Sequence, residues 1–292
     1  MTDTLETLVA EELAVAVDPA VTSLATAIAE AHGKASRAVL FYGSCLREKQ
    51  LDGLMLDFYL IVSDYRQAYD RRWLGFANRL IPPNVFPFEA EGMTAKYAVL
   101  SEADFHRLNG PETRNVSVWA RFAQPSRLVW AADQAARDKA IAAVARAAPT
   151  LLASAILAVP DSDDPLDLWR GAFRLTYSAE LRAERKARSG SVVDSDPERY
   201  RRFTNPALHA IATATGRQPG GGWARRRIEG KMLSVMRLAK ASATFAGGVD
   251  YIAWKINRHA GTAIVIKPWQ RRWPLLAAIS LVPKLLRSGA VR

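Results

Sequence analysis

The stretch "AVLFYGSCLREKQLDGLMLDFYLIV" (residues 38–62) decides the fold class. Two apolar runs of strand length flank Gly43 and Ser44, and the second run carries Asp57 where a strand interior favours Val or Ile. An unpaired buried carboxylate costs several kcal/mol or becomes protonated. The sequence therefore predicts a partner for Asp57, such as a metal ion.

Outward from this stretch, the apolar runs predict further strands among helices. Strands are predicted at residues 37–44, 54–63, 95–101 and 126–132. Residues 4–31 predict one or two helices broken near Pro19, residues 66–81 a helix, and residues 82–92 a Pro-rich connection. The first half is therefore expected to be α/β.

The strand signal disappears from about Asp133 onward. Helical periodicity runs through residues 135–159, 167–188 and 224–246, with a Gly-rich break at 216–222. The second half is expected to be mainly helical.

Length, hydrophobic content and cysteine count indicate a globular protein without disulfide bonds. The chain has 292 residues, 49% of them hydrophobic, which is enough for a sizeable core. Its single cysteine, Cys45, excludes a disulfide framework and fits a reducing, cytoplasmic setting. The N-terminus has acids and no Lys or Arg before Lys34, unlike a transit peptide, and no apolar run reaches the roughly 18 to 20 residues that cross a bilayer.

Positive charge is concentrated in the C-terminal quarter of the chain. Residues 221–292 hold 14 Lys and Arg against two acids, whereas residues 1–220 hold 26 basic and 27 acidic residues. A basic segment of this kind is attracted to a polyanionic surface, either anionic lipid or nucleic acid.

The Gly-Ser turn and the acidic strand have the core layout of nucleotidyltransferases. Gly43 lets the backbone approach a triphosphate, and Ser44 with neighbouring N–H groups can cradle its oxygens. Carboxylates on the adjacent strand can hold Mg²⁺ against the phosphates, with Asp57 the first ligand and Asp52 the best second candidate. The alternative is an ordinary turn glycine with Asp57 at a strand edge in water.

Five segments of the chain occur in an order and spacing typical of one family. They are "YGS" with "MLDF" (42–44 and 55–58), "AKYAVLS" (95–101), "WARFAQPSRLV" (119–129) and "LTYSAELRAE" (175–184). On these motifs the chain resembles the peripheral, mitochondrial-type phosphatidate cytidylyltransferases, the CDP-diacylglycerol synthases of the translocator assembly and maintenance family. The resemblance covers about residues 38–185.

The resemblance implies a fold, a reaction and partners. It implies an α/β nucleotidyltransferase-type domain with a mixed sheet and flanking helices at 1–135, a mainly α, winged-helix-like domain at 136–250, and a basic, Trp-rich, membrane-associating segment at 251–292. The implied enzyme uses Mg²⁺, CTP and phosphatidate. The alternatives are a nucleotidyltransferase that acts on RNA, protein or a small molecule, and an inactive lipid-binding relative.

The resemblance also implies roles for individual residues. Tyr42, Gly43, Ser44 and Arg121 would bind the nucleotide, Asp57 with Asp52 the metal, and Lys96 a phosphate, while Tyr177, Glu180 and Arg182 fall on the family's second-domain segment. The family's Trp-His and Gly-Ala-Gly-Val-Tyr segments are replaced by other residues in this chain. The resemblance therefore does not identify the residues that recognise the nucleotide base, nor the lipid phosphate that is the acceptor.

The basic C-terminus combines aromatic residues, cations and short apolar runs. Trp254, Trp269, Arg271, Arg272 and Trp273 are the residues expected at the headgroup level of an anionic membrane. The aromatic residues stand beside aliphatic runs and not in a base-stacking arrangement, which argues against nucleic acid. We therefore expect a cytoplasmic protein, peripheral on the inner face of the membrane; the alternative for this segment is a basic structured subdomain.

Overall fold

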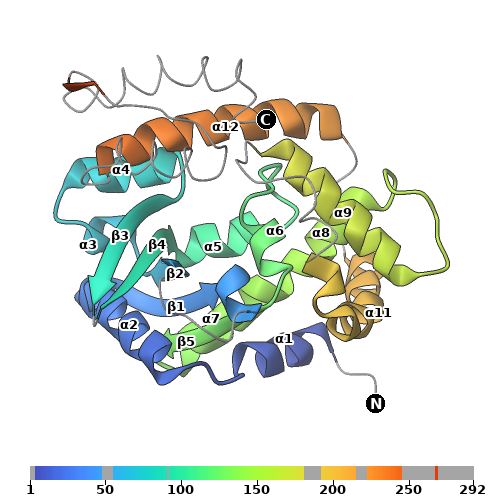
Figure 1. The fold of residues 1–292 in the computed structure, drawn as a ribbon, viewed down its shortest axis with the longest axis horizontal. Coiled ribbons are helices and arrows are strands. Elements are labelled where there is room, and N and C mark those ends of the chain that lie inside the picture. Colours follow the sequence, from blue (N-terminus) through green and yellow to red (C-terminus); the bar gives the residue numbers. More distant parts are fainter. Residues whose placement is uncertain are drawn as a thin grey trace.

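The computed structural model describes residues 4–47, 55–90, 92–180, 192–214, 222–244 and 267–268. A mixed five-stranded sheet lies at its centre, in the order β3-β4-β2-β1-β5, with helices on both faces (Figure 1). The strands are β1 (Ser36–Tyr42), β2 (Met55–Val62), β3 (Asn84–Ala90), β4 (Met93–Ser101) and β5 (Ser126–Ala131). Only β2 and β4 pair in parallel. The predicted mixed sheet with flanking helices is confirmed.

The predicted N-terminal helices are present. The N-terminal region forms α1 (Leu5–Leu13) and α2 (Pro19–Glu30), and the break near Pro19 is confirmed. The Asp18 side chain accepts from the Ala20 backbone N–H, and Pro19 occupies the first helical turn, where a missing N–H costs nothing. The helix predicted at 66–81 is divided into α3 (Tyr65–Ala68) and α4 (Arg72–Leu80).

The prediction of a Pro-rich connection at residues 82–92 was wrong, because most of this segment is strand β3. β3 pairs antiparallel with β4 at the edge of the sheet, with Pro87 opposite Lys96. An edge strand tolerates proline because one of its sides needs no hydrogen-bond donors.

The sheet has a hydrophobic layer on each face. One cluster joins alternate strand residues such as Val39, Phe58 and Val99 to α2 and α3. The other joins Leu40, Tyr59 and other residues of the opposite face to a larger set of helices. Those helices are α1, α5 (Glu102–Asn109), α6 (Trp119–Phe122), α7 (Gln134–Ala145), α8 (Ala147–Ala155), α9 (Pro165–Ala179) and α11 (Pro197–Thr213).

The described residues after Asp133 are mainly helical, as predicted. One continuous hydrophobic cluster runs through residues on both sides of position 135, so sheet and helices share a core here. The domain boundaries at 135 and 250 stay predictions. No helix within the described ranges is sufficiently long and apolar to cross a membrane.

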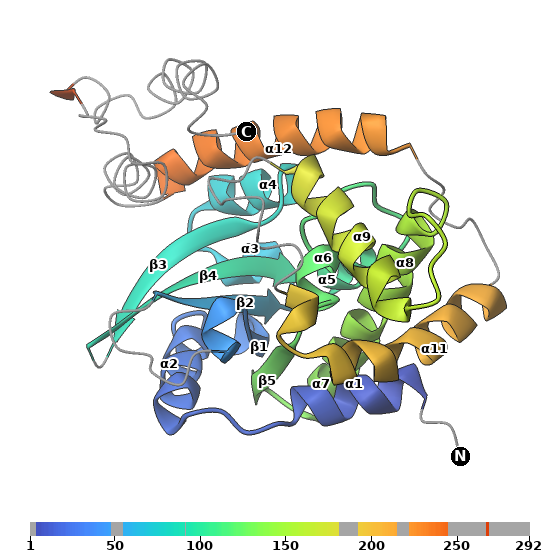
Figure 2. The same ribbon diagram turned by 45° about the vertical axis from the view of Figure 1, so that its right-hand side comes forward.

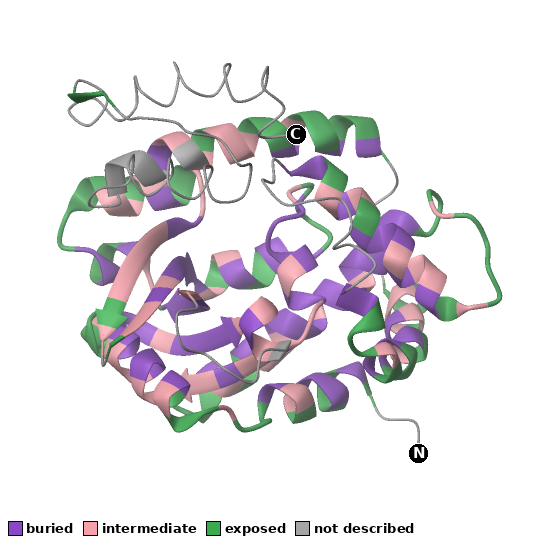
Figure 3. Cartoon of the chain, in the orientation of Figure 1, coloured by how far each residue is buried: buried purple, intermediate pink, exposed green. Residues whose placement is uncertain are grey.

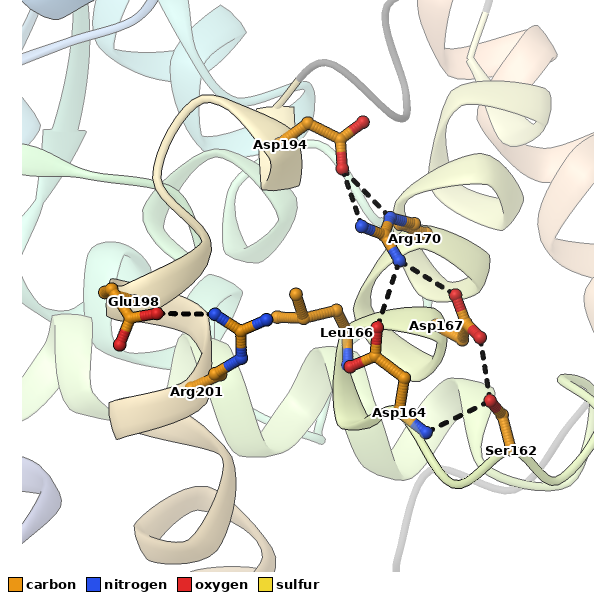
Figure 4. A network of polar contacts seen from close by, with 8 residues as sticks. All are labelled: Ser162, Asp164, Leu166, Asp167, Arg170, Asp194, Glu198 and Arg201. Atoms are coloured by element: carbon orange, nitrogen blue, oxygen red, sulfur yellow. Dashed lines mark hydrogen bonds and ion pairs between the residues drawn. The ribbon is translucent and has the colours of Figure 1, made fainter.

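Helix α9 is tied to the chain that follows it by a polar network (Figure 4). The Arg170 guanidinium contacts Asp167 at 2.9 Å, Asp164 at 3.5 Å and Asp194 at 2.8 Å. The Trp169 indole N–H also donates to Thr204 of α11 at 2.9 Å. These contacts orient α9, whose C-terminal end carries Glu180.

The long helix α12 (Trp223–Thr244) crosses one side of the molecule, beside α4 in both ribbon views (Figures 1 and 2). Its Arg226 donates to the Arg114 carbonyl at 3.0 Å, and its Arg237 donates to the Pro82 carbonyl at 2.9 Å. These bonds hold α12 against the loops that precede α6 and β3. Gly230 allows close approach to α9, because a Cβ there would lie 2.2 Å from the Ala179 carbonyl oxygen.

Candidate functional site: a cationic pocket at the end of the sheet

Three polar side chains form a row across neighbouring strands. Tyr42 of β1 pairs with Asp57 of β2, and Asp57 pairs with Lys96 of β4. Residues directly opposite one another in a sheet project to the same face. This face is the one that carries Leu40 and Tyr59, so the row points toward the helical half of the protein.

Lys96 is the observed partner of the Asp57 carboxylate. Its Nζ lies 2.8 Å from Asp57 Oδ1, and the two side chains are 25% and 20% exposed. The partner that the sequence predicted for Asp57 therefore exists in this structure as a lysine from the parallel neighbouring strand. Whether Asp57 also binds a metal stays a prediction.

The Gly-Ser turn lies directly against this carboxylate. Gly43 has a φ of +98°, and a Cβ at this position would lie 3.3 Å from Asp57 Oδ2. Glycine is the residue that adopts such a φ without steric cost. Ser44 begins the short 3₁₀ turn η2 (Ser44–Arg47), so β1 ends in a tight turn beside Asp57.

A pocket of about 170 Å³ lies between the sheet, α6 and α12. Its lining includes four cationic side chains: Lys96, Arg121, Arg237 and Lys240. Tyr42, Phe58, Tyr59, Pro83, Val85, Ala98 and Ser117 complete it. Sites that enclose a whole drug-sized ligand measure about 300–1,000 Å³. The pocket is thus of a size for a phosphate group and not for a whole nucleotide.

Arg121 is fixed between two acceptors. It donates to the Ser117 carbonyl, and its Nη1 lies 3.4 Å from Glu180 Oε1. Burial is the largest single influence and lowers the pKa of Arg121, but the charge and hydrogen bond of Glu180 together with Tyr59 and Tyr42 outweigh it, and the pKa rises above its usual value. Arg121 therefore stays cationic inside the protein.

Burial and the Asp57 charge raise the pKa of the neighbouring Tyr42. The Tyr42 phenol consequently stays neutral and can donate a hydrogen bond.

Helix α12 supplies the other two cations. Arg237 Nη1 donates to Ser117 Oγ at 2.7 Å, and Lys240 donates to the Ile81 carbonyl and, at 2.8 Å, to the Pro83 carbonyl. Burial lowers the pKa of Arg237, with the Glu180 charge opposing it. Burial, with the Arg237 charge second, lowers the pKa of Lys240 to about 7.

One side-chain donor of a residue that lines the pocket has no hydrogen-bond partner within the described residues. Arg237 Nη2 is buried and has no hydrogen-bond partner among the residues that the structure describes. A buried charged donor without an acceptor is costly, and it is the arrangement expected where a ligand supplies the acceptor. The four cations exceed the two nearby acids, Asp57 and Glu180, so the acceptor that this pocket favours is an anion.

The structure brings together seven of the fifteen residues predicted for the site. Tyr42, Gly43, Ser44, Asp57, Lys96, Arg121 and Glu180 lie at or beside the pocket. Tyr177 is half-buried and packs against the hydrophobic core. Asp52, Arg182, Trp254, Trp269, Arg271, Arg272 and Trp273 lie outside the described residues.

Sequence reasoning missed Arg237 and Lys240. Their spacing of three residues places both on one side of α12, which is a weak signal because surface cations show it equally often. Ser117, which binds Arg237, gave no signal at all.

The described residues form an anion site more readily than a metal site. Within the described ranges, no three His, Cys, Asp or Glu side chains come together. Mg²⁺ is commonly held by one or two carboxylates together with substrate phosphates. Asp57 fits that role as one ligand, and a second would be Asp52, outside the described residues.

Comparison with known proteins does not add to this geometry. No protein-family model and no curated protein matches the sequence.

Proposed function

We propose that the protein is a Mg²⁺-dependent nucleotidyltransferase that transfers CMP from CTP to phosphatidate, or to a close lipid phosphate. The products are CDP-diacylglycerol and pyrophosphate. The observation that carries the proposal is the unpartnered, buried Arg237 Nη2 within a four-cation pocket beside Asp57. A pocket with this charge and size suits a phosphate group, and a triphosphate and a lipid phosphate both supply one.

The chain's residues contribute position and charge. The Gly43-Ser44 turn receives the triphosphate, since Gly43 leaves room beside Asp57 and the turn offers backbone N–H groups. Lys96 and Arg121 neutralise phosphate oxygens. When bound, Mg²⁺ supplies further neutralisation of the phosphates.

The reaction needs one bond made and one broken. An oxygen of the lipid phosphate attacks the α-phosphorus of CTP, and the bond from that phosphorus to the bridging oxygen of pyrophosphate breaks in line. A phosphate monoester is already an anionic nucleophile near neutral pH, so no side chain has to accept a proton. Arg237 and Lys240 enter from the opposite wall of the pocket and are suited to hold the acceptor phosphate.

The finer fold assignment belongs to the same proposal. The sheet and its helices are interpreted as a nucleotidyltransferase-type domain, the following helices as a winged-helix-like domain, and residues 251–292 as a membrane-associating segment. We propose a cytoplasmic protein bound peripherally to the inner face of the membrane. The choice of CTP rests on the sequence resemblance.

A second candidate is an inactive lipid-binding relative. The observation that favours it is the Asp57–Lys96 ion pair, because the carboxylate that should bind metal already has a cationic partner at 2.8 Å. A nucleotidyltransferase that acts on RNA, protein or a small molecule shares the cationic pocket and differs only in its acceptor.

The test is pyrophosphate release with Mg²⁺ and each of the four nucleoside triphosphates, with and without phosphatidate in mixed micelles. The proposal predicts release only with CTP plus phosphatidate, and its loss in Asp57→Asn and Arg237→Gln. The matched control is Arg201→Gln, at an exposed site on α11. Release that persists in Asp57→Asn refutes the metal role. The absence of pyrophosphate release with every substrate favours the inactive relative.

A further inference from the structure

Two neighbouring helices carry most of the exposed large apolar side chains among the described residues. On α4 these are Trp73, Phe76 and Leu80, and on α12 they are Ile228, Met232 and Met236. Their exposed fractions reach 70% at Phe76 and 64% at Ile228. Spacings of three and four residues place each set in one stripe along its helix. Contiguous exposed apolar surface of this kind marks an interaction site.

The two stripes belong to one region of the surface. The helices lie beside each other in two views (Figures 1 and 2), and both carry exposed residues (Figure 3). The loop that leaves α4 is bonded to α12, because the Pro82 carbonyl accepts from Arg237 and the Pro83 carbonyl accepts from Lys240. We call the six apolar residues and their surroundings the α4–α12 face.

Positive charge surrounds this apolar surface. Exposed cations on or next to the two helices are Arg71, Arg72, Arg79, Arg225, Arg227 and Lys231. The acids on or next to the two helices are Glu229, which is 2.6 Å from Arg225, and Asp64 and Asp70 before α4, of which Asp64 is 4.0 Å from Arg79. The six cations therefore outnumber the three acids. Apolar side chains among Lys and Arg are the pattern of a surface that lies in the headgroup region of an anionic bilayer.

We propose that the α4–α12 face docks on an anionic lipid surface and presents the pocket to the lipid headgroups. The choice of lipid rests on the proposed function, and the geometry agrees with it. Arg237 and Lys240 reach from α12 into the pocket, and Pro83 between α4 and β3 lines it. Docking on this face would bring lipid phosphates close to the helix that carries the two cations, while the acyl chains stay in the bilayer. Only Trp73 and Phe76 of the six residues can stack on bases, so the face is not an aromatic stacking platform, which disfavours nucleic acid.

The test is sedimentation of the full chain with phosphatidylcholine vesicles, with and without phosphatidate. The triple variant Phe76→Ser/Leu80→Ser/Met232→Ser should lower the vesicle partition coefficient about tenfold or more, because binding scales with buried apolar area. The matched control Val15→Ser/Leu157→Ser removes exposed apolar residues elsewhere, 51% and 84% exposed. The control should bind as the unaltered chain does, and neutral vesicles should bind less than anionic ones.

Other outcomes overturn the proposal. If the triple variant sediments like the unaltered chain, the α4–α12 face is not the contact surface, and binding belongs to another part such as residues 251–292. If the triple variant loses binding to a single-stranded oligonucleotide but not to vesicles, the partner is nucleic acid.

Turnover is measured separately, as pyrophosphate release with a short-chain, soluble phosphatidate. Unchanged release in the triple variant shows that the pocket is intact. If the unaltered chain releases none, the proposed reaction fails while the vesicle result still decides the docking surface.

Discussion

The Asp57–Lys96 pair can be tested by a double-mutant cycle with Asp57→Asn and Lys96→Met. The two charges are 2.8 Å apart with side chains about one quarter and one fifth exposed. Coulomb's law gives about 1.5 kcal/mol for this separation at a dielectric constant of about 80, and about 6 kcal/mol at about 20. Desolvation offsets most of the larger value. We therefore expect a coupling energy of about 1.5–2 kcal/mol, at the lower end of the range for hydrogen bonds to charged groups.

The assay is urea unfolding of the four proteins, followed by tryptophan fluorescence. The control cycle is Glu198→Gln with Arg201→Gln on α11, where the side chains are 78% and 48% exposed (Figure 4). An exposed pair of this spacing should couple by about 0.2–0.5 kcal/mol. If the Asp57–Lys96 cycle gives no larger coupling energy than the control cycle, the ion pair with Lys96 does not contribute measurably to stability. The ion pair then gives no support to the inactive relative.

Three further predictions concern stability, pH and backbone conformation. Glu12→Gln should lower the free energy of unfolding, measured in urea, by about 3–5 kcal/mol, because it leaves the guanidinium of Arg199, which is 7% exposed, without a counter-charge. The control Glu11→Gln removes an exposed acid that pairs with Arg202, and should cost at most about 1 kcal/mol. Lys240 has a folded pKa of about 7 against an ordinary 10.5, so the unfolded chain binds more protons between these values. Stability should therefore rise with pH across that window. The affinity for a short-chain, soluble phosphatidate should fall above about pH 7, because Lys240 loses its proton there. A pH titration by calorimetry should show neither change in Lys240→Met. Gly43→Ala should abolish nucleotide binding in equilibrium dialysis while leaving vesicle binding intact, since the position has a φ of +98°; undiminished nucleotide binding would remove the turn from the site.

The strands could be predicted because apolar runs bounded by turns are a local signal. β1, β2, β4 and β5 all lie within one or two residues of their predicted bounds. Strand β3 could not be predicted in this way, because Pro82, Pro83 and Pro87 are typical of a loop between elements. What makes β3 a strand is its place at the edge of the sheet, which depends on the pairing with β4.

The candidate site was only partly predictable for a similar reason. Gly43, Ser44 and Asp57 are linked by a short stretch of chain, and their proximity follows from two adjacent strands. The contact between Asp57 and Lys96 depends on the parallel register of β2 and β4, which neither strand reveals alone. Arg237 comes from a helix some 180 residues away in sequence, so only tertiary structure places it in the pocket.

The order in which the pocket walls appear along the chain has a consequence for synthesis on the ribosome. Domains fold as their residues emerge, from the N-terminus onward. Lys96 and Arg121 emerge early, but Arg237 and Lys240 emerge only after the sheet and α9 are complete. The nascent protein therefore has half of its pocket cations until α12 has emerged. Full anion binding is therefore gained only when α12 joins the sheet, which makes it a sensitive reporter of that step.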